Sequence, residues 1–158
     1  MGRKRKHITE YEIVDELMRL EAEIFRVLKN TPKKYQFDLA QQTFDQLGYM
    51  KRLVGKALYL MPIAASDWSV KTAVLNEAFS EMGALRINLC QFVRLGAMSN
   101  ETFARIDLQY NIVENNFLRL LAALAAKCGG SDAGGCALGS EPDMIRTCDC
   151  RSEGGSYG

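Results

Sequence analysis

Apolar residues recur every three or four positions through four segments of the chain, and each segment therefore predicts an amphipathic helix. The first begins at Thr9, where Glu12 three residues later completes a capping box. It ends before Pro32, because the residue that precedes a proline is pushed out of the α region. The other three segments run from about Gln36 to Met61, from Ser66 or Asp67 to Gly96, and from Ser99 or Asn100 to Lys127.

Three of these segments carry one apolar stripe each. The stripes comprise Ile13, Leu17, Leu20, Ile24 and Val27 in the first segment, Leu75, Ala78, Met82, Leu85, Leu89 and Phe92 in the third, and Phe103, Ile106, Tyr110, Val113, Phe117, Leu120 and Leu124 in the fourth. The second segment carries two lines, one through Phe37, Ala40, Phe44, Leu47, Lys51, Val54, Leu58 and Met61, the other through Leu39, Thr43, Met50, Leu53, Ala57 and Leu60. We therefore expect this helix to be buried on two sides, with its second line at an interface between copies of the chain.

Short connections between long helices favour neighbours that pack antiparallel. The sequence thus predicts an all-α fold, an antiparallel up-down-up-down four-helix bundle over residues 9–127. Residues 1–8 form a basic N-terminal tail. Residues 128–158 are rich in Gly, Ser and Asp and have no apolar period, so we expect a disordered tail that is dispensable for folding and binding.

Composition and charge narrow the class of protein. The chain has 158 residues, enough for one domain, and a net charge of +1. Residues 1–127 hold 18 Lys and Arg against 14 Asp and Glu, whereas residues 128–158 hold 2 against 5. We expect no transmembrane helix, because no apolar run reaches about 18 residues, and no secretory signal, because no apolar region follows the basic start. Five cysteines, an odd number, favour reduced thiols and a cytoplasmic location.

The residue types needed for catalysis are sparse. The only histidine is His7, and the Glu-x-x-His pairs of di-metal bundles are absent, as are a phosphate-binding loop and a Ser/His/Asp set. We therefore expect a protein that is not an enzyme and that has no cofactor. Cys148 and Cys150 are too close in sequence for the usual zinc pair, and Cys128 and Cys136 complete no known ligand spacing, so no metal site is predicted.

Basic residues gather around the stretch TPKKYQFDL, residues 31–39. A turn there needs only Pro32 and a few polar residues, yet it holds two adjacent lysines. The candidate nucleic-acid-binding residues are Arg26, Lys29, Lys33, Lys34 and Tyr35 near this turn, Lys51, Arg52 and Lys56 on the second helix, and Arg86 and Arg94 on the third. Tyr35 offers a flat ring on which a base could stack, and each charge is equally consistent with an ordinary solvated side chain. Lys51 occupies an apolar position, so either it extends to solvent or it faces a solvent-filled or anion-filled space.

Two stretches resemble a known family. FRVLKNTPKKYQFDLAQQTFDQLGYMKRLVGKA and LNEAFSEMGALRINLCQFVRLGAMSNETF are similar to the Avd proteins, the accessory variability determinants of diversity-generating retroelements. The shared features are the proline–basic–basic turn before an aromatic residue, a leucine–arginine helix and the short turn into the last helix. The resemblance covers about residues 15–125. The stretch DQLGYMKRLVGKAL departs from the motif of the related four-helix proteins encoded in ribosomal RNA intervening sequences, and the family's Gly-Gly-Trp-like ending is absent.

The resemblance implies a homopentameric bundle that binds nucleic acid and a reverse transcriptase, and that supports copying of a template RNA. The alternative from the residues alone is a non-catalytic protein–protein adaptor bundle with no role in nucleic-acid binding. A gel shift with RNA at increasing salt distinguishes the two, because phosphate contacts weaken steeply as salt rises.

Overall fold

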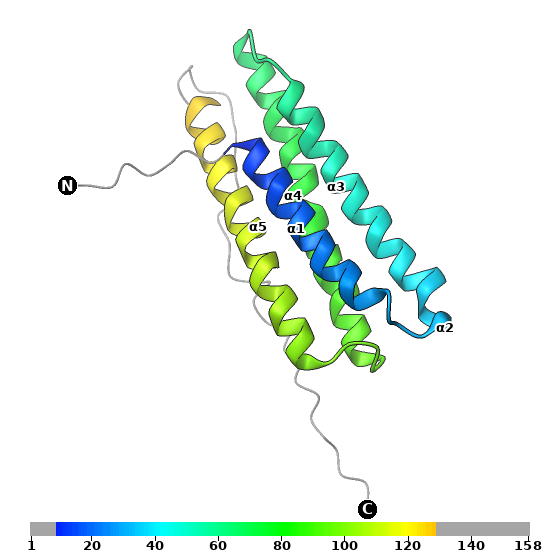
Figure 1. Ribbon diagram of the computed structural model, residues 1–158. Helices are drawn as coiled ribbons and strands as arrows, with labels where there is room; N and C mark the ends of the chain where they lie inside the picture. Colours follow the sequence, from blue (N-terminus) through cyan, green and yellow to red (C-terminus); the bar gives the residue numbers. More distant parts are fainter. Residues whose placement is uncertain (1–8, 129–158) are drawn as a thin grey trace, which may run out of the picture.

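The computed structural model describes residues 9–128, and every regular element in that range is helical. The elements are α1 (Glu10–Leu28), α2 (Lys33–Tyr35), the π-helix η1 (Gln36–Ala40), α3 (Gln41–Tyr59), α4 (Ala65–Arg94) and α5 (Asn100–Cys128) (Figure 1). The predicted all-α class is confirmed for this range. Cys128, which the sequence assigns to the tail, is the last residue of α5. The tails predicted at residues 1–8 and 129–158 lie outside the described residues.

The four long helices lie side by side (Figure 1). α1 packs against α3 and α5, and α4 packs against the same two helices. The short α2 lies at one end of the molecule, where α1 leads into α3, and the connection from α3 to α4 lies at the opposite end (Figure 1). Residues that the chain places at these two ends are therefore separated by the full length of α3.

The predicted stripes form the core between the helices. All six stripe residues of α4 are buried, as are those of α5 apart from Phe103 and those of α1 apart from Val27, and both exceptions pack against the core. Most of the stability of helices in proteins comes from packing of their apolar faces rather than from intrinsic propensity, so this shared burial is what stabilises all four helices.

The prediction that the second helix is buried on two sides is wrong. Leu39, Met50, Leu53 and Ala57, from the line predicted to lie at an interface between copies, are buried within the chain. Ala40, Leu47 and Val54, from the other line, are buried beside them, whereas Met61 is exposed. The reason is geometric: two lines that run three or four residues apart are neighbours on a helix, so both fall on one broad stripe. The side chain of Phe37 lies outside the description.

The helix ends follow local capping chemistry. Thr9 and Glu12 form the predicted capping box at the start of α1. Gly96 ends α4 with a φ of 71°, and the Ala97 N–H donates to the Phe92 carbonyl at 2.9 Å, which is the Schellman arrangement that favours glycine. Ser99 caps α5, since its Oγ accepts from the Thr102 N–H at 3.1 Å.

The start of α4 differs from the prediction. The helix begins at Ala65 after the cap residue Ala64, so neither Ser66 nor Asp67 is the cap. Instead the Asp67 carboxylate accepts hydrogen bonds from the N–H groups of Ala64 at 2.8 Å and Ile63 at 3.0 Å. These two bonds hold the pKa of the Asp67 carboxyl below its ordinary value. They also fix the chain that leads into the helix.

Within residues 9–128, the ion pair with the least exposed side chains joins Lys71 and Glu10. The Lys71 ammonium of α4 lies 2.5 Å from a carboxylate oxygen of Glu10 at the start of α1, and only 11% and 12% of their side-chain surfaces are exposed. Desolvation of both charges offsets most of their attraction, so the pair itself adds little net stability. A change that removes one partner, however, leaves the other charge buried.

We predict that Lys71→Ala lowers the free energy of unfolding by about 3 kcal/mol, because Glu10 is then buried without its cation. The control Arg19→Ala breaks surface pairs with Asp15 and Glu16 and is expected to cost under about 1 kcal/mol. Denaturant titration measures both. Equal losses of stability in the two variants would contradict the burial of the Lys71 charge.

Candidate nucleic-acid interface

The stretch between α1 and α3 is helical over most of its length. Pro32 is the cap residue, and Lys33, Lys34 and Tyr35 form α2, where the Tyr35 N–H donates to the Pro32 carbonyl at 2.9 Å. The second helix therefore starts at Lys33, three residues before the predicted start at Gln36. The two lysines occupy the first turn of a helix, whereas the sequence predicts a turn between helices there.

This corner of the molecule is held by side-chain hydrogen bonds. The Gln36 amide donates to the carbonyl of Thr31 at 2.6 Å, and the Thr43 hydroxyl donates to the carbonyl of Leu39 at 2.8 Å. Each bond involves a residue of the π-helix η1, Gln36–Ala40. A π-helical turn is rare and occurs often at functional sites. The sequence carries no signal of it, because the apolar period continues through it.

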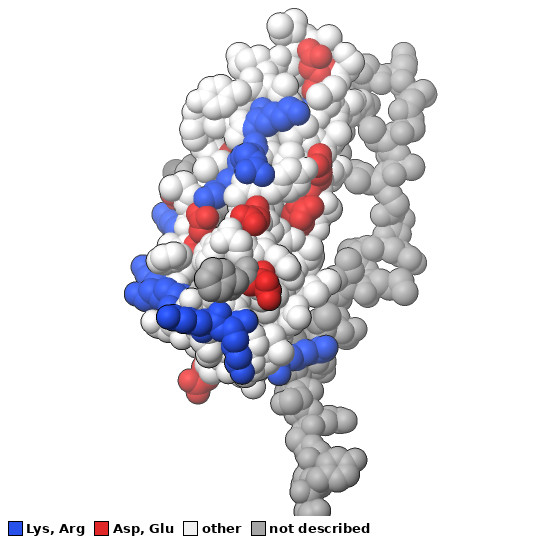
Figure 2. All heavy atoms as spheres, turned by 90° about the vertical axis from the view of Figure 1, so that its right-hand side faces the viewer, with Lys and Arg blue, Asp and Glu red and all other residues white. Residues whose placement is uncertain are grey.

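Three lysines at this corner are available to bind an anion. Lys29, Lys33 and Lys34 are exposed, and within residues 9–128 the structure gives them no ion pair. Figure 2 shows the face of the molecule that lies on the right in Figure 1. Basic side chains gather on it at the end where α2 lies. The Lys34 ammonium lies 4.7 Å from the centre of the Tyr35 ring, so the lysine already occupies one face of the ring that is predicted to stack on a base. We call Lys29, Lys33 and Lys34 the lysine corner.

The helix dipole separates these lysines into two kinds. Lys29 caps the C-terminus of α1, and Arg94 lies in the last turn of α4 at the same end of the molecule. Cations there are stabilised by the negative ends of the helix dipoles. Lys33 and Lys34 are instead the first residues of α2, which continues without a break through η1 into α3. They therefore lie at the N-terminus of this longer helix, a position that favours Asp and Glu. Helix stability therefore explains Lys29 and Arg94, but it does not explain Lys33 and Lys34.

Several of the predicted binding residues already contact other side chains of the same chain. The Arg26 guanidinium lies 2.5 Å from Glu23, and the Lys51 ammonium lies 2.5 Å from Glu21 of α1. The space that Lys51 faces therefore contains a carboxylate of the chain itself. Arg52 lies over the Tyr49 ring, with its guanidinium carbon 5.7 Å from the centroid. Lys56 is exposed on the same helix.

Arg86 bridges α4 and α5. Its guanidinium lies 3.2 Å from a carboxylate oxygen of Asp107 and 5.4 Å from the centre of the Tyr110 ring. The Tyr110 hydroxyl donates in turn to the Met82 carbonyl at 2.8 Å, and burial raises the pKa of that hydroxyl. Arg86 is thus part of a polar contact between helices, which leaves it less available to an RNA phosphate than the lysine corner is.

The structure also shows where the net positive charge comes from. Of the 18 basic residues in 1–127, four lie at positions 3–6, outside the described residues, and the other 14 balance 14 acidic residues. The helical part therefore has no net formal charge. Its surface is positive only where several basic side chains lie close together. On the face shown in Figure 2, acidic side chains lie between the basic group near α2 and a second basic group farther along.

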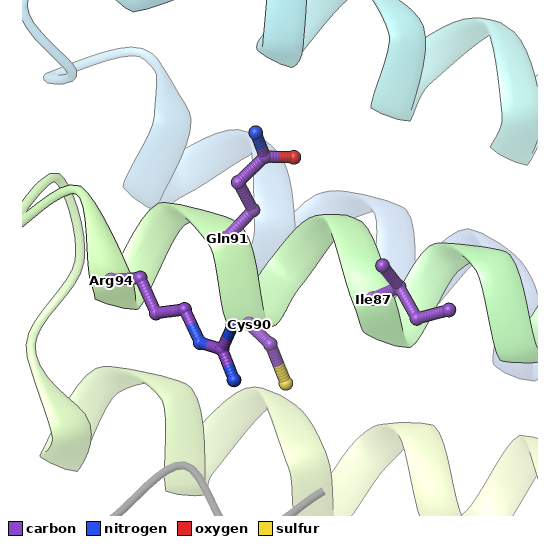
Figure 3. A pocket seen from close by; sticks show the side chains of 4 residues that line it. All are labelled: Ile87, Cys90, Gln91 and Arg94. Carbon is purple, nitrogen blue, oxygen red and sulfur yellow. The ribbon is translucent and has the colours of Figure 1, made fainter. Parts of the chain in front are cut away.

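A shallow pocket lies beside the last turns of α4 and is lined by Ile87, Cys90, Gln91 and Arg94. Figure 3 shows Cys90 and Arg94 on the same side of the helix and Gln91 pointing away from them. No group of three or more His, Cys, Asp or Glu side chains that could hold a metal is found among residues 9–128. The pocket has one charged side chain and therefore adds a single cation, Arg94, to this end of the molecule.

Comparison of the chain with protein-family models, with curated proteins and with solved structures gives no match. Within the described range, none of the helices has the length and apolar character needed to cross a membrane.

We predict that Arg86→Gln lowers the free energy of unfolding by about 1–3 kcal/mol, because the partly buried Asp107 carboxylate loses its charged donor. The matched change Arg94→Gln removes an exposed arginine from the same helix and should stay within about 0.5 kcal/mol of the unchanged protein. Thermal and denaturant unfolding compare the two variants. If Arg86→Gln leaves the free energy of unfolding unchanged, the packing of α4 against α5 does not need this charge.

Proposed function

We propose that this chain is a nucleic-acid-binding accessory subunit that partners a reverse transcriptase in template-RNA copying for a diversity-generating retroelement. One observation carries the RNA-binding part: Lys33 and Lys34 are exposed, have no ion pair within residues 9–128, and occupy helix positions that disfavour cations. The identity of the element and of the enzyme rests on the resemblance of two segments to the Avd proteins.

In this proposal the protein acts in the cytoplasm as a non-catalytic antiparallel up-down-up-down four-helix bundle. The packing of α1 and α4 against both α3 and α5 supports that arrangement. Such a scaffold holds the lysine corner on the ends of packed helices rather than on a long loop. Phosphates can then be bound without first ordering the chain, which lowers the entropic cost of association.

The RNA surface that we propose is smaller than the set of residues singled out from the sequence. It consists of the lysine corner with Arg94 at the same end, and of Arg52 and Lys56 on the outer face of α3. Lys51, Arg26 and Arg86 contribute less, because each already has a carboxylate partner. Tyr35 contributes through the ring face that Lys34 does not cover.

We predict that the double change Lys33→Glu and Lys34→Glu weakens RNA binding and lowers the slope of log affinity against log salt by about two, roughly one unit for each phosphate that the protein no longer binds. The melting temperature should not fall, since glutamate in the first turn of a helix interacts favourably with the dipole. Gel shifts at several salt concentrations, with a thermal melt of each variant, measure both effects.

The control Arg19→Glu with Arg119→Glu changes the net charge by the same amount on α1 and α5, at positions farther along the helices from the lysine corner. It should weaken RNA binding less and preserve more of the salt slope. If the affinity of the two double variants falls equally, the effect is one of overall charge. If the Lys33 and Lys34 variant binds RNA at low salt as tightly as the unchanged protein does, the corner is only a solvated turn.

An exposed apolar flank on α1 supports self-association and also favours the alternative function. Tyr11, Met18 and Phe25 are spaced seven residues apart and are 66%, 55% and 56% exposed, so they lie on one side of the helix. The Phe25 ring packs 5.8 Å from that of Phe44 on α3. We call Tyr11, Met18 and Phe25 the α1 flank.

The α1 flank takes the place of the second apolar line of α3 as the proposed interface of a homopentamer. Large apolar side chains in a row are more often found at contacts between proteins than on free surfaces. If the same flank binds a different protein and RNA binding is absent, the chain is a protein–protein adaptor bundle. The RNA gel shift described above separates these two functions.

We predict that Met18→Glu converts a homo-oligomer into smaller species, because a carboxylate would be buried at the centre of the α1 flank. Leu108→Glu, at a site on α5 that is 69% exposed, serves as the control and should leave the mass unchanged. Light scattering coupled to size exclusion gives the mass of each variant. A stable monomer of the unchanged protein at micromolar concentration would exclude the pentamer.

A further inference from the structure

A second group of basic residues lies on the outer side of α3. Arg52 and Lys56 are exposed and four residues apart, so they are neighbours on the helix surface. Within residues 9–128 the structure gives neither of them an ion pair, and the Arg52 guanidinium lies over the Tyr49 ring instead. We call Arg52 and Lys56 the far cluster, because most of α3 separates them from the lysine corner.

The chain between these two basic groups carries the opposite charge. Residues 35–50 contain Asp38 and Asp45 and no lysine or arginine, and both aspartates are exposed. Figure 2 shows acidic side chains between two basic groups on one face of the molecule. The positive surface along α3 is therefore interrupted.

The neighbouring helix α4 widens the acidic stretch. The Tyr49 hydroxyl of α3 donates to the Glu77 carboxylate of α4, and the Gln46 amide donates to the Glu81 carboxylate at 3.0 Å. These bonds hold two further negative charges beside the middle of α3. We call the four carboxylates the acidic band: Asp38, Asp45, Glu77 and Glu81.

This alternation of charge distinguishes between the forms of RNA. Proteins that bind single-stranded RNA without sequence preference use a basic groove that follows its backbone. A single strand laid along α3 would bring phosphates against the acidic band, and their repulsion would offset the attraction of the basic groups. An A-form duplex instead has a wide, shallow minor groove that displays 2′-hydroxyls between two rows of phosphates. Its phosphates can contact the basic groups while its groove faces the acidic band.

The spacing of the basic groups also fits separated rows of phosphates. Lys34 and Arg52 lie about 27 Å apart along the continuous helix that α2, η1 and α3 form, since an α-helix rises about 1.5 Å per residue. Their long side chains can bring the two charged groups closer together. Neighbouring phosphates of one strand cannot bridge this gap, whereas phosphates on opposite sides of a groove are far enough apart.

We infer that the lysine corner and the far cluster bind the two phosphate rows that border the minor groove of double-stranded RNA, with the acidic band facing the groove. This inference rests on the proposed function and specifies the form of RNA that the protein binds. The carboxylates of the acidic band can accept hydrogen bonds from the 2′-hydroxyls, which DNA lacks. The band thus repels a single strand and is compatible with a paired one.

The first test removes the far cluster from the full chain with Arg52→Gln and Lys56→Gln. The probes are an RNA duplex of about 16 base pairs and an unpaired oligouridylate with the same number of phosphates. For the duplex, the slope of log affinity against log salt should fall by about two, because two phosphate contacts are lost. For the oligouridylate it should fall by less than about one, because a single strand occupies one basic group at a time and the lysine corner remains.

The matched control is Arg19→Gln with Arg119→Gln, which removes the same charge from α1 and α5. It should lower the salt slope for the duplex less than the far-cluster variant does. A thermal melt of each variant shows whether the fold is retained.

The second test neutralises part of the acidic band with Asp38→Asn and Asp45→Asn. The affinity for the oligouridylate should rise at least about threefold, because its phosphates no longer meet these carboxylates, whereas the affinity for the duplex should change less than about twofold. The control Asp15→Asn with Glu114→Gln makes the same change of net charge on α1 and α5. It should affect both RNAs by similar, smaller factors.

The possible failures are distinguishable. If the far-cluster variant keeps the salt slope for the duplex, or if the acidic-band variant gains equally for both RNAs, this inference alone is overturned, since RNA binding is retained. Equal affinity of the unchanged protein for a DNA duplex of the same length also overturns it, because that groove has no 2′-hydroxyls. If the unchanged protein binds neither form of RNA, the inference and the proposed function both fail.

Discussion

The orientation of every surface group depends on the apolar core that α1, α3, α4 and α5 share. Leu17, Leu47, Leu85 and Phe117 are each fully buried in it, one from each helix. Helices of this length gain most of their stability from such packing rather than from the intrinsic preference of their residues. Once each stripe faces the core, the opposite side of each helix must face solvent or a partner. The lysine corner lies at the end of the molecule where α1 leads into α3, so the packing of these two helices positions it.

Polar contacts between helices add specificity to this packing. Gln46 of α3 donates to the Glu81 carboxylate of α4 at 3.0 Å, and Gln109 of α5 donates to the Glu16 carboxylate of α1 at 2.6 Å. Such contacts sit at the edges of the core and are satisfied only in one register of neighbouring helices. Ion pairs between helices also neutralise basic side chains. Lys51 pairs with Glu21, and Arg86 pairs with Asp107.

The surface that is left has different chemistry at its two ends. Lys29, Lys33 and Lys34 lie at the end that contains α2, and the exposed apolar side chains of Tyr59, Met61 and Ile63 lie at the other end, close in sequence to the exposed Lys56. None of these six side chains contributes to the core, and the stability of the helices does not explain Lys33, Lys34 or the three apolar side chains.

Local chemistry determined much of this protein from its sequence. The capping box at Thr9, the glycine end at Gly96 and the stripes of α1, α4 and α5 were predictable, because a helix end or a helix face depends on residues within one or two turns. Charge pairing was not predictable in this way. Whether Arg86 or Lys33 is available depends on which carboxylate a neighbouring helix brings within reach, and that carboxylate is 21 residues away from Arg86 in the chain.

The tertiary structure likewise decided the burial of α3 and the exposure of the α1 flank. Met50 lies on the apolar line that the sequence analysis assigns to an interface between copies, and Met18 lies beside the predicted stripe of the first helix. Met50 is buried because α3 turns that side toward the core, whereas Met18 is 55% exposed because α1 covers the core with the adjacent side. Periodicity specifies that a helix has an apolar side, but the width of the core, set by all four helices together, decides how much of that side is covered.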